Sequence, residues 1–166
     1  MTTIPEPYGA LPSPRQLNWH ALEFYGFLHF TTNTFTDLEW GFGDESPTIF
    51  NPTDFDANHI VAVAEEAGMK GLILTCKHHD GFCLWDTKLT DYKATQTLAA
   101  RDLIKPMVEA FREEGLKVGF YHSLIDWHHP EFPVDGIHPQ RDDVAFREQV
   151  KDRDIRKYAE YLHGQV

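Results

Sequence analysis

The alternation of short apolar runs with helix-like segments constrains the fold of this chain more than any other feature of its sequence. Three apolar runs have the length and residue types of buried strands: residues 24–30, 71–76 and 118–123. Three segments carry helical periodicity: residues 51–70, 102–117 and 142–166, the last as one long helix. Strands that alternate with helices predict an α/β fold with a parallel sheet and crossover helices.

Two observations favour a barrel over a nucleotide-binding sheet. The phrase "EEAGMKGLIL" recurs in form as "REEGLKVGFY", a weak internal repeat at the spacing of one βα unit. Neither GxGxxG nor GxxxxGK[ST] follows the first strand. We therefore expect the first three βα units of a (β/α)₈ (TIM) barrel over residues 19–166, preceded by an extended, proline-rich arm over residues 1–18. A barrel takes about 250 residues, so this one would be incomplete and the chain the N-terminal piece of a longer protein.

The composition excludes some classes of partner. A formal net charge of −11 argues against binding nucleic acid or an anionic membrane surface. The first 20 residues lack the pattern of a signal peptide, and no apolar run approaches the roughly 20 residues of a membrane span. Together with two cysteines, Cys76 and Cys83, which we expect to be reduced, this predicts a soluble, cytoplasmic protein.

Imidazole and phenol groups stand where the predicted strands end. His29 closes the first strand, His78 and His79 follow the second, and Tyr121 and His122 lie in the third. In a barrel the carboxyl ends of the strands carry the functional residues. A neutral imidazole offers one donor and one acceptor, which suits a sugar hydroxyl. Carboxylate and indole groups for the same ligand are available from Glu39, Trp40 and Trp85.

Two other interpretations of these residues stay open. The histidines could simply satisfy loop carbonyls, although four positions at three successive strand ends make that less attractive. They could also bind zinc, with candidate ligands His29, His78, His79, Asp80, His122, His128 and His129. No HExxH or comparable spacing supports a metal site, so we expect none.

Three motifs at successive strand ends resemble one known family. "HFTTNTFTDLEWG", "KHHDGFCLW" and "VGFYHSLIDW" are similar, in order and spacing, to the N-terminal motifs of the family 29 glycoside hydrolases, the α-L-fucosidases. The resemblance covers most of residues 24–166. It implies a (β/α)₈-like barrel with a C-terminal β-sandwich, retaining hydrolysis of terminal α-L-fucosides, and no cofactor. The stretch "NTFTDLEWG" is closer to the branch that prefers α-1,3 and α-1,4 linkages.

The resemblance also implies substrate-binding residues. They are His29, Glu39, Trp40, His78, His79 and Tyr121. The histidines would bind hydroxyls, Glu39 and Trp40 would hold the sugar, and Tyr121 would lie beside the reacting carbon. Thr31 departs from the family pattern, because many members have glycine there.

The two catalytic carboxylates of a retaining glycosidase have no match in this chain. The resemblance places the nucleophile and the acid/base beyond Val166, so we expect the chain alone to be inactive. We expect Asp80 to fix its loop, Asp126 lies in the stretch "IDW", which resembles a family loop, and Glu39 suits hydroxyl binding better than catalysis.

The partner predicted for the chain is a fucosylated oligosaccharide or glycoconjugate. Three strands leave both sheet edges open, which favours self-association or complementation by the rest of a barrel. The alternatives are a non-catalytic carbohydrate-binding or interaction module built on the same fold and, less favoured, a metal-dependent hydrolase.

Overall fold

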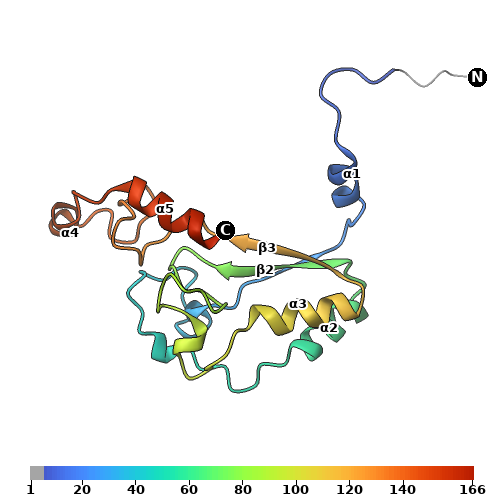
Figure 1. Ribbon diagram of the computed structural model, residues 1–166, viewed down its shortest axis with the longest axis horizontal. Coiled ribbons are helices and arrows are strands. Elements are labelled where there is room, and N and C mark those ends of the chain that lie inside the picture. The colour runs from blue at the N-terminus through green and yellow to red at the C-terminus, as the bar shows by residue number, and fades with distance from the viewer. Residues whose placement is uncertain (1–5) are drawn as a thin grey trace, which may run out of the picture.

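A computed structural model describes residues 6–166 and shows a three-stranded sheet in the order β1-β2-β3 (Figure 1). The strands are β1 (Gly26–Leu28), β2 (Gly71–Lys77) and β3 (Lys117–His122), and both neighbouring pairs are parallel. The prediction of an α/β fold with a parallel sheet is confirmed. Each strand lies beside its predecessor in the chain, so the carboxyl ends of all three strands meet at one edge of the sheet.

Two helices cover one face of this sheet (Figure 1). They are α2 (Ala57–Glu66) and α3 (Ile104–Glu113). Asp56 caps the start of α2 by accepting the His59 N–H, and Asp102 accepts the Ile104 and Lys105 N–H groups at the start of α3. The core between helices and sheet consists of Val61, Ala64, Leu72, Leu74, Met107, Ala110 and Phe111.

The opposite face of the sheet is partly exposed. Side chains alternate along a strand, so Ile73 points away from the core that Leu72 and Leu74 enter. On this face the rings of Phe27 and Tyr121 lie 5.5 Å apart, and 47% of the Phe27 surface is exposed. An apolar face of this kind is what the inside of a barrel requires.

The predicted long helix over residues 142–166 is wrong. The segment forms two helices, α4 (Val144–Gln149) and α5 (Ile155–Gln165). Asp154 interrupts the helix because its backbone is extended and its carboxylate accepts the Arg156 N–H at 2.9 Å, which caps a new helix. Aspartate favours such a cap over a helix interior.

The extended arm over residues 1–18 is wrong for its last part, while residues 1–5 lie outside the described residues. Helix α1 (Pro14–His20) begins with a capping box. Ser13 N–H donates to the Gln16 side chain, and the Ser13 hydroxyl accepts the Gln16 N–H. Serine followed by proline is a start signal that suits the first turn of a helix.

Short 3₁₀ turns shape the long loops. They are η1 (Thr32–Phe35), η2 (Pro47–Ile49) and η3 (Ala94–Gln96). The first two lie in the loop after β1. Between residues 6 and 166, none of the helices is long and apolar enough to cross a membrane.

Candidate functional site

A cavity of about 400 Å³ opens beyond the carboxyl ends of β1 and β2. It is lined by His29, Thr31, Asn33, Thr34, Leu38, Glu39, Trp40 and His78. Four of the six predicted substrate-binding residues belong to this lining. Thr31 is buried and forms part of one wall.

The other two predicted residues lie directly beside the cavity. The His79 ring is 4.4 Å from the His78 ring and 6.1 Å from the Trp40 ring, measured between centroids. Tyr121 lies 6.0 Å from His78 and 6.3 Å from His29. The fold therefore brings together side chains from β3, from the ends of β1 and β2, and from the first long loop.

Hydrogen bonds behind the cavity orient two of the imidazoles. His29 Nδ1 is 2.9 Å from the Thr75 hydroxyl of β2. His79 Nδ1 is 2.7 Å from the Ser123 hydroxyl, which also accepts the Ile125 N–H at 3.0 Å. The contact fixes the orientation of the His79 ring whichever of the two groups donates the proton, and it leaves Nε2 outside this hydrogen bond.

Burial keeps the imidazoles neutral. It lowers the pKa of His29, His78 and His79 from the ordinary histidine value. The effect is largest at His78, where burial together with the neighbouring His79 and His29 lowers the pKa to about 4. At neutral pH the three rings therefore form a cluster of uncharged donors and acceptors, which suits an uncharged, hydroxyl-rich ligand better than an anion.

The lowered pKa of His78 predicts a pH-dependent stability. Between about pH 4 and pH 6.5 the unfolded chain binds a proton that the folded chain does not, so stability falls as the pH drops through this range. Relative to His78→Gln, the wild-type protein should lose about 1–2 kcal/mol between about pH 7 and pH 5, allowing for partial exposure of the ring. Urea unfolding across this range measures the free energy of unfolding of both proteins. Above about pH 7 the two free energies should change with pH in parallel, which serves as an internal control. Parallel changes down to about pH 5 would contradict the prediction.

The indole near the site differs from the one that the sequence offered. Trp85, an available indole for the ligand by sequence, lies beside His122, with ring centroids 5.6 Å apart, and does not line the cavity. Trp127 takes a place near the site, 6.2 Å from Trp40 and 5.4 Å from His79. The signal was present in the motif "SLIDW", which also contains Ser123.

The remaining histidines of the zinc hypothesis are engaged elsewhere. His122 Nε2 is 3.1 Å from the Gln165 side-chain oxygen, and His128 Nδ1 is 2.7 Å from the Gly43 carbonyl. His129 Nδ1 accepts the Glu131 N–H. Across residues 6–166, no three His, Cys, Asp or Glu side chains are grouped so that they could hold a metal ion.

The carboxylates near the site have structural partners. Asp80 is fully buried and accepts two hydrogen bonds, from the Phe82 N–H at 2.8 Å and from the Thr32 hydroxyl at 3.3 Å. Burial raises the pKa of Asp80 to about 7. These contacts agree with the expected role of Asp80 in fixing its loop. Asp126 is paired with Lys77, whereas Glu39 is exposed at the cavity.

Fold and site together define a class of protein. Parallel βα units carry a polar cavity, bounded by neutral imidazoles and a tryptophan, at the carboxyl ends of the strands. Barrel enzymes that act on small polar ligands place their sites at this end of the sheet.

Comparison with known proteins identifies the family. The family model described as "Alpha-L-fucosidase" matches residues 9–165. Alpha-L-fucosidase 1 of Arabidopsis thaliana is 44% identical over 127 residues, which are 75% of this chain and 25% of that protein. Over most of its length, this chain therefore belongs to the alpha-L-fucosidase family.

Solved structures of bacterial fucosidases agree. Alpha-L-fucosidase isoenzyme 1 from Paenibacillus thiaminolyticus is 41% identical with a TM-score of 0.78, over 90% of this chain and 38% of that one. A Ruminococcus gnavus family 29 fucosidase, solved in complex with fucose, is 29% identical with a TM-score of 0.75, over 99% of this chain and 33% of that one. The chain thus spans between a quarter and two fifths of these three relatives.

Proposed function

We propose that this protein acts in the hydrolysis of terminal α-L-fucosides, with its three βα units forming part of a (β/α)₈ barrel. One observation carries the proposal: the structure gathers His29, His78, His79 and Tyr121 from three strand ends around a cavity that Glu39 and Trp40 also border. The family match supports the same activity.

Each of these side chains has a role in holding the sugar. The neutral imidazoles exchange hydrogen bonds with fucose hydroxyls, and the exposed Glu39 carboxylate accepts further ones. The Trp40 ring packs against the C–H face of the sugar, as aromatic rings do at carbohydrate sites. Tyr121 shares with Phe27 the face of the sheet opposite α2 and α3, and in this proposal it lies beside the reacting carbon.

The catalytic carboxylates come, in this proposal, from further strands of the barrel. Retaining glycosidases need two carboxyl groups about 5–5.5 Å apart that flank the scissile bond. Asp80 and Asp126 are buried and committed to loop contacts, so neither is free to attack a sugar. Glu39 alone cannot supply both roles.

The test is hydrolysis of an aryl α-L-fucoside by this chain and by a chimera that joins residues 1–165 to the remainder of the Paenibacillus enzyme. Activity in the chimera alone is the expected result, with circular dichroism to verify that both proteins fold. Hydrolysis by the short chain would place the nucleophile among residues 1–166. A folded chimera without activity would overturn the proposal, and binding of L-fucose by that inactive chimera would instead favour a carbohydrate-binding module.

A further inference from the structure

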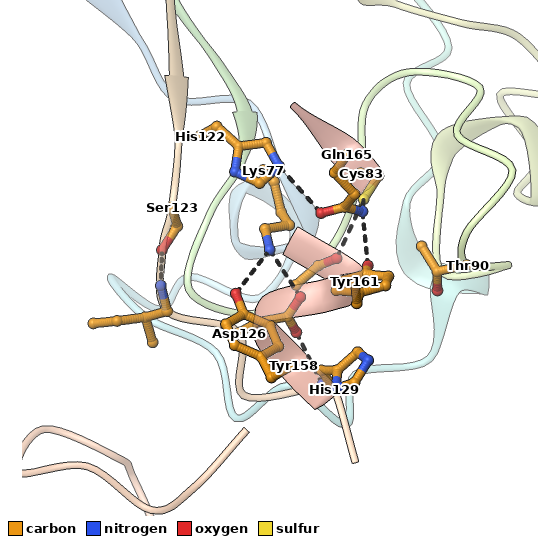
Figure 2. Close-up of polar contacts among 12 residues, drawn as sticks. Lys77, Cys83, Thr90, His122, Ser123, Asp126, His129, Tyr158, Tyr161 and Gln165 are labelled. Carbon is orange, nitrogen blue, oxygen red and sulfur yellow. Dashed lines mark hydrogen bonds and ion pairs between the residues drawn. The ribbon is translucent and has the colours of Figure 1, made fainter. Parts of the chain in front are cut away.

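A fully buried lysine lies at the end of β2, behind the candidate site. Lysine is almost never completely buried unless it is paired. The Lys77 side chain is 0% exposed, and its Nζ is 2.9 Å from Asp126 Oδ2, whose side chain is 2% exposed (Figure 2). The Tyr158 hydroxyl lies 3.3 Å from the same Nζ. In the part of the chain that the structure describes, Asp126 is the one anionic partner of this cation.

The pair joins the two loops that hold His79. The first loop, residues 78–82, follows β2, and the second, residues 123–129, follows β3. Three hydrogen bonds connect the second loop to the end of β2 and to the first loop. The Ser123 N–H donates to the Lys77 carbonyl at 2.9 Å, and the Trp127 N–H donates to the His79 carbonyl at 2.8 Å. The third joins His79 Nδ1 and the Ser123 hydroxyl at 2.7 Å. His79 is therefore held at its ring and at its backbone.

Helix α5 closes the pair from a third side (Figure 2). The Tyr158 hydroxyl donates to the Leu124 carbonyl at 2.8 Å, which ties the helix to the second loop. The ring of Tyr161 lies 5.6 Å from Lys77 Nζ. Gln165 donates to the Tyr161 hydroxyl at 2.7 Å and accepts from His122 of β3. With these contacts in place, the Lys77 side chain has no exposed surface.

In this arrangement the position of the second loop depends on the charges of Lys77 and Asp126. In a dry environment an ion pair resists separation far more strongly than at a surface, because neither charge can be solvated on its own. Both anchors of His79, the Ser123 hydroxyl and the Trp127 N–H, lie within three residues of Asp126. A displacement of Asp126 would therefore carry the anchors with it.

We propose that Lys77 and Asp126 are positioning residues for sugar binding: their ion pair fixes residues 123–127 against residues 78–82, so that His79 keeps its orientation and presents Nε2 to the ligand. Neither residue lines the cavity. The part of this inference that concerns sugar rests on the proposed function, whereas the part that concerns the His79 ring does not.

The test compares Lys77→Met, Asp126→Asn and the double variant Lys77→Met/Asp126→Asn in the full chain. Methionine replaces the apolar stem of lysine without its ammonium group, and asparagine keeps an acceptor for the His129 N–H that Asp126 binds. The matched control is Lys157→Met, which removes an ion pair of the same 2.9 Å length to Glu131 at the surface. Three quantities are measured: the melting temperature, the ¹⁵N signals of the His79 ring without sugar, assigned with His79→Gln, and the dissociation constant for L-fucose.

Each single variant should melt lower, because it leaves one buried charge without its partner. The double variant should recover most of the melting temperature, since it buries no charge. We expect it still to show displaced His79 ring signals and a dissociation constant for L-fucose raised at least tenfold. Lys157→Met should match the wild type in the His79 signals and the dissociation constant.

A double variant with wild-type His79 signals would overturn the inference, because the pair would then serve stability alone. The sugar measurement is judged separately. If the wild-type chain does not bind L-fucose, the proposed function loses its support for this chain, while the sugar-free His79 signals still decide whether Lys77 and Asp126 position the ring.

Discussion

Replacement of Gly81 with alanine should lower the free energy of unfolding by about 3 kcal/mol, because the backbone strain and a steric clash of the new Cβ act together. Gly81 has a φ of +83°, which L-residues adopt at a cost. A Cβ at this position would also lie 2.3 Å from Asp126 Oδ1 and 2.8 Å from the His128 Cβ. The loop after β2 would have to move away from the loop after β3. Urea unfolding of wild type and variant measures the loss.

A second glycine separates the two causes. Gly68, two residues after the end of α2 at Glu66, has a similar φ of +79°, but a Cβ there would meet no atom within 4 Å. Gly68→Ala should therefore show the backbone cost alone, about 1 kcal/mol. Equal losses in the two variants would mean that the contact between Gly81 and Asp126 adds nothing, and that the two loops are packed less tightly than the structure shows.

Replacement of His79 with alanine in the active chimera should reduce kcat/KM about a hundredfold, close to 3 kcal/mol of transition-state stabilisation. The reason is the loss of a hydroxyl-binding imidazole that Ser123 and the Trp127 backbone hold in place. Hydrogen bonds to sugar hydroxyls strengthen as the transition state forms, so the loss should appear in kcat as well as in KM. Steady-state kinetics with an aryl α-L-fucoside measures both.

Two controls accompany this variant. His59→Ala removes an exposed imidazole from α2, away from the cavity. Cys76→Ser alters a buried thiol in β2 that donates to the Leu74 carbonyl. Both should keep wild-type kcat/KM. A loss in Cys76→Ser equal to that of His79→Ala would show that packing, rather than hydroxyl recognition, explains the effect.

The strand-end location of the site was predictable from the sequence. Apolar runs and helical periodicity give the order of strands and helices, and parallel strands bring their carboxyl ends to one edge. His29, His78 and His79 were therefore placed near one another by topology alone. Their distances depend on local geometry, including a register shift between Thr75 and Lys77 against β3.

The location of the tryptophans could not be predicted from the sequence. Trp85 and Trp127 both follow strands, and nothing in their spacing says which one turns toward Trp40. The answer depends on the path of two loops, which is fixed by contacts between residues far apart in the chain, such as Lys77 with Asp126. Such long-range contacts produce no periodic pattern in the amino-acid sequence.

The sequence by itself thus determined the order of the elements, the parallel sheet, and the set of polar residues at the strand ends, because these follow from local patterns and from strand direction. The break between α4 and α5, the loop contacts around His79, and the neutral state of the imidazoles were decided by the tertiary structure. Helix ends, loop paths and pKa values depend on which distant groups surround a residue, and that surrounding exists only in the folded chain.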